Sequence, residues 1–247
     1  MKLILEKNMQ ILSFTLKINK IRLRPFFLLG MFLMSIYTYG QDTIVVRDME
    51  TWSSVGLKHK INKKWTALLE GELRLNNNSS EIKKYFGQFE LEYSFSKHFE
   101  FSGGLRYTKE NDNKGRIQGY RDHFRYNFDG VYKQKINDLS LKYRIRYQNS
   151  KELNEDDKLK EIVRFKVDAE YNIKKWKLDP ELSGELFRSV GSESNNQLES
   201  YRITLGTTFD IHKSAKMKLF YGFDNELNTE FPKAVSILGV KYIYNLK

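Results

Sequence analysis

From Thr51 onward, the chain alternates apolar and polar residues with a period of two, in blocks of about ten residues. In the block Leu139–Gln148 every odd-numbered residue is apolar and every even-numbered residue is polar. A helix would instead space its apolar residues three and four positions apart. Because about ten residues is also the length of a tilted strand that crosses a bilayer, the pattern predicts an all-β fold of membrane-spanning strands.

The connections between these blocks alternate in length. The short ones are expected at 62–64, 96–98, 136–138, 174–175 and 212–214, and the long ones at 76–84, 109–118, 149–159, 190–197 and 228–233. Tight periplasmic turns and longer external loops are typical of antiparallel β-barrels in the outer membrane of Gram-negative bacteria. The sequence therefore predicts an antiparallel transmembrane β-barrel.

The number of strands follows from counting the blocks. Eleven are clear, and their centres are Val55, Leu69, Phe89, Gly103, Tyr126, Tyr143, Val167, Leu182, Leu205, Leu219 and Val240. The order of short and long connections makes the first and last blocks run in the same direction, so a closed antiparallel barrel needs one more strand. Gln41–Asp48, with a turn near Met49–Glu50, is the only candidate. We therefore predict about twelve strands, with ten as the alternative.

The first forty residues have the order of a secretory signal peptide. Basic residues precede an apolar run at 26–37, and small or polar residues such as Thr38 and Gly40 follow it. The basic part is long, so translation could start at an internal Met such as Met9. An N-terminal membrane anchor is the alternative, but the run is shorter than the ~17–25 residues that a spanning helix needs. We expect a cleaved signal over 1–40 and a single barrel domain over 41–247, located in the outer membrane.

Alternation alone does not show which face of a barrel points inward. A lipocalin-like barrel, with an apolar interior, would have the same stripes, but it has eight strands. Aromatic residues also lie on the apolar stripe close to both ends of the blocks, as in the aromatic girdles of membrane barrels. The predicted girdle residues are Trp65, Phe99, Tyr107, Tyr147, Tyr171, Trp176 and Phe209.

Three short segments carry a resemblance to a known family. They are the early Trp52, the hairpin from Lys64-Trp65-Thr66 to Glu72-Leu73-Arg74, and Gly119-Tyr120-Arg121 at the start of a later strand. With these features the chain resembles the outer-membrane barrel family catalogued as domain of unknown function 2490. The resemblance covers nearly all of the mature chain and implies the fold and the location. The family has no assigned activity, so no catalytic residue is implied.

Charged residues on the polar stripe are segregated by sign. We predict an acidic wall in the lumen formed by Glu70, Glu72, Glu90, Glu92 and Glu100, and a basic wall formed by Arg121, Arg125, Lys142, Arg144, Arg146, Arg164 and Lys166. If water separates the two walls, the lumen is a narrow passive channel. If they touch, salt bridges close it and the barrel is structural.

A lipid-modifying enzyme, a hydrolase or an acyl transferase, is the rival functional class. It needs a nucleophile and a base on one face. The best candidate base, His123, lies between Arg121 and Arg125, and we expect no carboxylate to orient it. The chain has no cysteine, which excludes thiolate metal sites and disulfides. We expect no catalysis, no cofactor and no metal.

The charge of the chain limits its partners. The formal charge of +11 falls to about +6 without the predicted signal, and no basic cluster with stacking aromatic residues stands apart from the strands. We therefore expect no nucleic acid as partner. The expected partners are outer-membrane lipid, lipopolysaccharide, the barrel-assembly machinery and small solutes.

Overall fold

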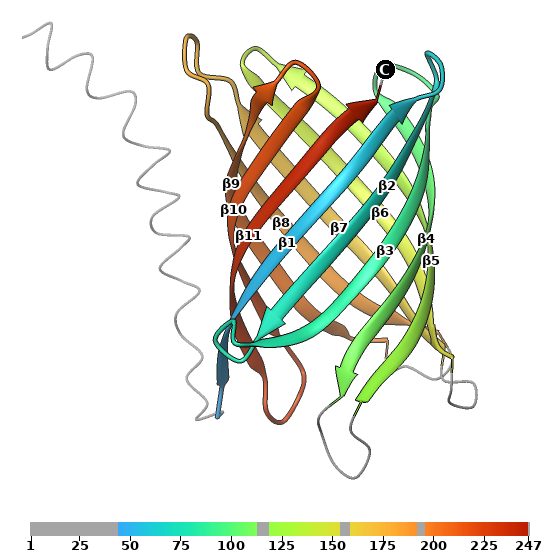
Figure 1. Ribbon diagram of the computed structural model, residues 1–247, viewed down its shortest axis with the longest axis vertical. Coiled ribbons are helices and arrows are strands. Elements are labelled where there is room, and N and C mark those ends of the chain that lie inside the picture. The colour runs from blue at the N-terminus through green and yellow to red at the C-terminus, as the bar shows by residue number, and fades with distance from the viewer. Residues whose placement is uncertain (1–43, 113–118, 154–158, 192–195, 247) are drawn as a thin grey trace, which may run out of the picture. The chain divides into compact units, whose positions relative to one another are not determined.

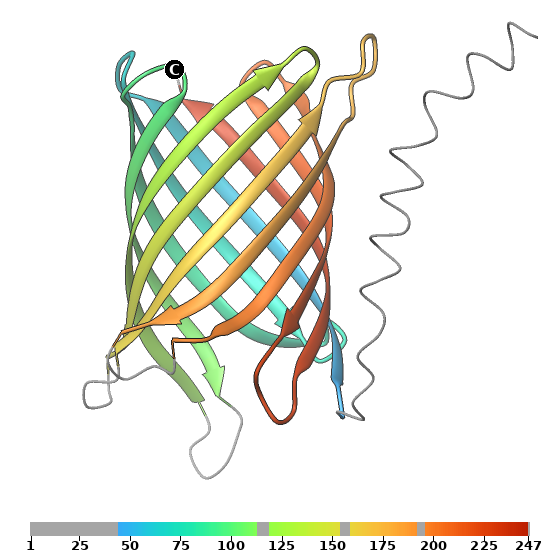
Figure 2. The same ribbon diagram turned by 180° about the vertical axis from the view of Figure 1, so that it is seen from behind.

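The computed structural model describes residues 44–112, 119–153, 159–191 and 196–246, which form a closed barrel of eleven strands (Figures 1 and 2). Among the described residues no helix is long and apolar enough to cross a membrane. The strands are β1 (Val46–Lys60), β2 (Trp65–Asn76), β3 (Glu81–Ser94), β4 (Phe99–Asp112), β5 (Gly119–Ile136), β6 (Leu139–Glu152), β7 (Leu159–Tyr171), β8 (Asp179–Val190), β9 (Leu198–His212), β10 (Ala215–Glu226) and β11 (Lys233–Leu246). Each of the eleven predicted blocks is one of these strands. The predicted signal peptide lies outside the described residues.

The first and last strands close the barrel as a parallel pair. β1 pairs with β11 from Val46↔Lys233 to His59↔Leu246, whereas every other neighbouring pair is antiparallel. The prediction of twelve strands is therefore wrong, and so is the alternative of ten. A parallel ladder satisfies both edge strands, so closure does not require an additional strand.

The turn predicted near Met49–Glu50 does not form, because β1 runs through it. Glu50 and Trp52 keep the two-residue period and both place their side chains in the interior, where they are 2% and 8% exposed. The backbone at Glu50 pairs with Ile237 of β11 in the same ladder. The segment that was predicted to be a separate strand is thus partly the beginning of β1.

The connections define two ends of the barrel. The short-turn end, at the top of Figure 1, carries the connections that follow β1, β3, β5, β7 and β9, and the long-loop end carries the others. The predicted alternation of lengths is not strict. β2 and β3 are joined only by Asn77–Ser80, whereas the β7–β8 connection, predicted to be short, covers 172–178.

The tight β2–β3 turn has a local cause. Asn77, Asn78 and Ser79 all have positive φ angles, between 51° and 65°, a conformation that Asn tolerates better than most residues. The carboxylate of Asp48 on β1 accepts hydrogen bonds from the backbone N–H groups of Asn77 (3.1 Å) and Asn78 (2.8 Å). A four-residue turn therefore replaces the long loop that was predicted here.

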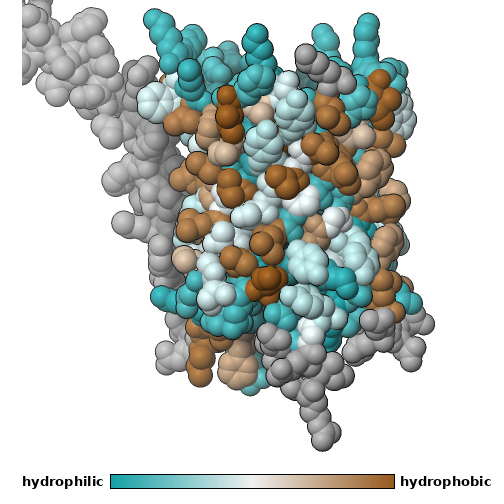
Figure 3. Space-filling model, in the orientation of Figure 1, coloured by the Kyte–Doolittle hydropathy of each residue, from teal (hydrophilic) through white to brown (hydrophobic). Residues whose placement is uncertain are grey.

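The barrel buries polar side chains and exposes apolar ones. Among the described residues six apolar side chains are buried, against thirteen polar or charged ones. Large apolar residues stand outward on every strand; Phe128 is 62% exposed and Leu205 is 58% exposed. Figure 3 shows apolar residues over the visible side of the barrel, with hydrophilic residues gathered at its upper end. Most of the large apolar side chains of the described strands therefore lie on the outer surface of the barrel.

Close packing inside the barrel strengthens the seam between β1 and β11. Gly239 on β11 lies under the ring of Phe220 on β10, and a Cβ atom at Gly239 would overlap that ring. The ring of Trp52 on β1 lies edge-on to Phe220, with the ring centres 6.4 Å apart. Aromatic contacts of this geometry link the three strands around the seam.

Candidate functional site: the charged lumen

The inward faces of the strands carry a network of ion pairs. Glu185 of β8, only 4% exposed, is its main acceptor. Arg144 of β6 lies 2.7 Å from its carboxylate, Arg164 of β7 lies 2.8 Å away and Arg202 of β9 lies 4.0 Å away. One carboxylate thus joins four strands. Its burial is tolerated because the charge is paired on several sides.

Arg146 of β6 makes a contact that reaches past two intervening strands. Its guanidinium binds both carboxylate oxygens of Asp129 on β5, and its Nη2 atom lies 3.3 Å from Glu90 on β3. Arg146 and Asp129 are each 5% exposed. A two-pronged Arg–carboxylate contact is among the strongest polar contacts in proteins. It holds β6 against β5 and links both to β3.

The residues of the predicted acidic wall have separate partners. Glu70 pairs with Lys241 of β11, Glu72 pairs with Arg74 at 2.5 Å on its own strand, and Glu100 pairs with Lys133 of β5. Glu92 has no ion-pair partner among the residues that the structure describes. Glu90–Arg146 is the contact that the structure shows between members of the two predicted walls.

The residues of the predicted basic wall lie at three depths. Arg121 is at the long-loop end, where it contacts Asp112 and Glu152, the latter at 3.6 Å. Arg125, Arg144, Arg146 and Arg164 lie deeper, on β5, β6 and β7. Lys142 and Lys166 line the mouth at the short-turn end. The basic residues therefore follow the length of the lumen.

Sequence reasoning missed the two carboxylates that bind these arginines best. Asp129 and Glu185 both lie inside predicted blocks and on the inward parity, so alternation alone could have placed them in the lumen. Their ion pairs were not foreseeable in the same way, because Arg144 lies 41 residues from Glu185 in sequence. The arginines pair mainly with these carboxylates rather than with Glu70 or Glu72.

Arginines also stack on aromatic rings in the half of the lumen nearer the long loops. Arg74 lies 3.5 Å from the ring centre of Trp52, and Arg202 lies 4.7 Å from it. The indole N–H of Trp52 donates to Glu50 at 2.7 Å, and Glu50 also pairs with Lys83 at 2.5 Å. Cation–π contacts and hydrogen bonds together fix Trp52 across the lumen.

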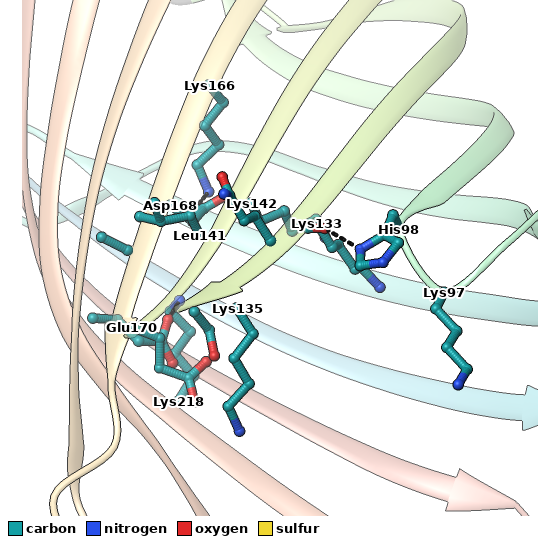
Figure 4. Close-up of a pocket in the computed structure, with 14 residues that line it drawn as sticks. Lys97, His98, Lys133, Lys135, Leu141, Lys142, Lys166, Asp168, Glu170 and Lys218 are labelled. Carbon is teal, nitrogen blue, oxygen red and sulfur yellow. Dashed lines mark hydrogen bonds and ion pairs between the residues drawn. The ribbon is translucent and has the colours of Figure 1, made fainter. Parts of the chain in front are cut away.

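Two adjoining cavities occupy the rest of the lumen. A central cavity of about 420 Å³ is lined by charged residues that include Glu70, Arg106 and Glu185. A second cavity of about 500 Å³ opens at the short-turn end (Figure 4). Lys166 and Lys218 line both cavities, so the cavity at the mouth adjoins the central one.

The mouth is rich in lysine. Figure 4 shows Lys166 beside Asp168, with which it pairs at 2.6 Å, and His98 bonded to the backbone oxygen of Lys133 at 3.0 Å. The lysines that line the mouth are Lys97, Lys133, Lys135, Lys142, Lys166 and Lys218, against Asp168, Glu170 and Glu181. The excess of cationic groups makes the local potential positive and favours anions at the entrance.

The predicted girdle residues occupy both ends of the barrel. Tyr147 donates a hydrogen bond to Glu161, and it is partly buried, as is Phe209. The remaining five are exposed on the outside: Trp65, Phe99, Tyr107, Tyr171 and Trp176.

The chemistry available at the histidines is limited. The sequence predicts no carboxylate to orient His123, and Glu110 lies 3.9 Å from its Nε2 atom, beyond hydrogen-bond distance. Glu110 is also bound by Lys84 at 3.2 Å, which competes for the same carboxylate. Within the described ranges, no group of three or more His, Asp or Glu side chains could hold a metal ion.

Comparison with known proteins assigns the chain to a family. No curated protein matches the chain. A family model described as a protein of unknown function (DUF2490) matches residues 49–233, which include Trp52, Lys64–Arg74, Gly119–Arg121 and most of the lumen network. Lys64–Arg74 was predicted to be a hairpin, but it lies almost entirely in the single strand β2. Because the match covers most of the chain, the protein belongs to the DUF2490 family of proteins of unknown function.

Proposed function

We propose that this protein is a non-catalytic barrel of the Gram-negative outer membrane and that its lumen is a narrow passive channel for small charged solutes. The apolar outer surface, with aromatic residues near both ends, supports the membrane location. The chain would reach the outer membrane after export with a cleaved signal peptide. Lipid, lipopolysaccharide and the barrel-assembly machinery would be its partners there.

The two adjoining cavities carry the proposal of a channel. A barrel that serves only as a structural element would fill its lumen with side chains, as small barrels do. Here the mouth and the centre together offer several hundred Å³ lined by charged groups. The narrowest region is expected around Trp52 and Arg74, so only small solutes would pass.

Conductance in planar bilayers tests this function. We expect the purified protein to give small, ohmic currents. Arg144→Gln should shift the reversal potential toward cations, because fixed charge in a lumen sets ion selectivity. Glu185 keeps Arg164 and Arg202 as partners in this variant, so the fold should persist.

Lys64→Gln is the matched control for Arg144→Gln. It removes one positive charge from the β1–β2 turn, where Lys64 lies 5.8 Å from the ring of Tyr93 and outside both cavities. Its reversal potential should equal that of the wild type. Silent bilayers with folded protein would contradict the channel and leave a structural barrel.

The rival proposal, a lipid-modifying enzyme, has one observation in its favour, the proximity of His123 and Glu110. No serine or threonine hydroxyl bonds to His123 in the described part of the chain. Release of fatty acid or lysolipid from vesicles by the wild type, with loss of that release in His123→Ala, would establish the enzyme and overturn the passive function. We expect no release by either protein.

A further inference from the structure

Arg106 and Arg125 form a pair of like charges in the middle of the barrel wall. They lie directly opposite one another on β4 and β5, and both side chains point into the lumen. Both guanidinium groups bond to the same neutral atom, the side-chain oxygen of Gln88 on β3. Arg106 reaches it at 2.5 and 2.8 Å, and Arg125 reaches it at 3.2 Å.

The neighbouring arginines are arranged differently. Arg144, Arg146, Arg164 and Arg202 each contact a carboxylate within 4.0 Å. Among the described residues neither Arg106 nor Arg125 has such a partner, and the Nε atom of Arg125 is buried without any hydrogen-bond acceptor. Two adjacent cations that share one neutral acceptor leave positive charge uncompensated.

The surrounding charges do not cancel this excess. The charged groups near Arg106 are Arg125, Arg74, Arg146 and Glu72, so three of the four are cations. The carboxylate of Glu72 is engaged by Arg74. Asp129, which is near Arg125, is held on both oxygens by Arg146. The nearby carboxylates are therefore already committed to other arginines.

We propose that Arg106 and Arg125 form a binding site for a small oxyanion, either a phosphate or a carboxylate, in the lumen. Arg106 and Gln88 line the central cavity of about 420 Å³, so a solute in that cavity meets both of them. Arg125 lies beside them, bonded to the same Gln88 oxygen. An oxyanion can accept parallel N–H bonds from both guanidinium planes, a geometry to which arginine is well suited.

Packing holds the site ready for its ligand. The guanidinium of Arg106 lies 3.5 Å from the ring centre of Phe86, which is 4% exposed and fixes its position. Gln88 is 6% exposed and orients both groups from one side. The lysine-rich mouth adjoins the central cavity that Arg106 lines and would concentrate anions next to it. An arrangement that needs little reorganisation on binding gives higher affinity.

Calorimetric titration with inorganic phosphate tests the site. The full barrel is kept in a zwitterionic detergent, and sodium chloride holds the ionic strength constant. We expect one phosphate per barrel. Arg125→Gln and Arg106→Gln should each weaken binding by about tenfold or more, since each removes a charged donor from the ligand. Succinate should compete with phosphate if the site accepts oxyanions as a class.

Lys64→Gln is the matched control, because it removes one positive charge outside both cavities and does not touch the pair. Its affinity should stay within about twofold of the wild type. The mobility of unheated protein on a gel confirms that each variant is folded. A second measurement needs no ligand: in urea without phosphate, Arg125→Gln should be at least as stable as the wild type, because it relieves repulsion.

Two results would overturn the site. One is a wild type that fails to bind phosphate, and the other is that the Arg125→Gln and Arg106→Gln variants bind phosphate with the same affinity as the wild type. A clear loss of stability in Arg125→Gln without phosphate would also count against it, since it would assign the arginine a structural role. The titration does not depend on conduction. If the barrel conducts but does not bind phosphate, the channel proposal stands and the binding site is excluded. If it binds phosphate but does not conduct, only the binding site stands.

Discussion

The two faces of the same strands follow different rules. On the outer face of β6, Tyr143 and Ile145 are exposed, and the hydrophobicity of each position matters more than any single partner. On the inner face, Arg144 and Arg146 each require particular carboxylates. The outer face is thus determined by local sequence, whereas the inner face depends on residues far away in the chain, such as Glu70 and Lys241, which are 171 residues apart.

The largest effect is expected when an arginine is placed on one face or the other of β9. Leu205→Arg should lower the free energy of folding into lipid by about 2–4 kcal/mol, because the charge would lie in the proposed membrane. Thr204→Arg should have a much smaller effect, since Thr204 lines the polar central cavity, where the new charge can be solvated. A urea titration in lipid vesicles measures both. Equal losses would show that the faces are not differently solvated.

A smaller effect is expected from breaking one ion pair of the lumen. Arg146→Gln should destabilise the barrel by about 2 kcal/mol, because Asp129 and Glu90 lose their charged donor. Adding Asp129→Asn should recover part of that loss, since the unpaired buried carboxylate is then gone. The same urea titration compares the three proteins. Additive losses in the double variant would mean that the two residues do not depend on each other.

The smallest effect concerns packing next to the seam. Gly239→Ala should destabilise by about 1 kcal/mol, because the new methyl group overlaps the ring of Phe220. Phe220→Leu in the same chain should relieve the overlap. Gly71→Ala is the control, since a Cβ atom there has no neighbour within 4 Å. If both alanine variants unfold at the same urea concentration, the ring does not constrain the seam.

Much of the fold can be predicted from the sequence. Strict alternation, as in Leu139–Gln148, identifies the strands and the face on which each residue lies, because side chains on a strand alternate. The closure could not be predicted in this way. Alternation is the same in parallel and antiparallel ladders, so nothing in Val46–Lys60 shows that β1 pairs with β11 in parallel.

For the lumen, the sequence likewise predicts which side chains point inward but not which of them contact each other. The parity of Arg106 and Arg125 places both side chains inside, but not on a shared oxygen of Gln88. That arrangement depends on the register between β3, β4 and β5, which several turns and their lengths determine together. Likewise, the four-residue β2–β3 turn depends on Asp48, a residue on a different strand.

Cysteine labelling along one strand tests the central claim, that the barrel places its apolar face in lipid and its charged face in water. The chain has no cysteine, so single cysteines can be introduced without background, for example at Lys142, Tyr143, Arg144 and Ile145. In protein reconstituted into vesicles, a small water-soluble maleimide should label positions 142 and 144, which line the cavities, and a lipid-soluble quencher should act on a fluorophore at positions 143 and 145. Water access at 143 and 145, or lipid access at 142 and 144, would contradict the account.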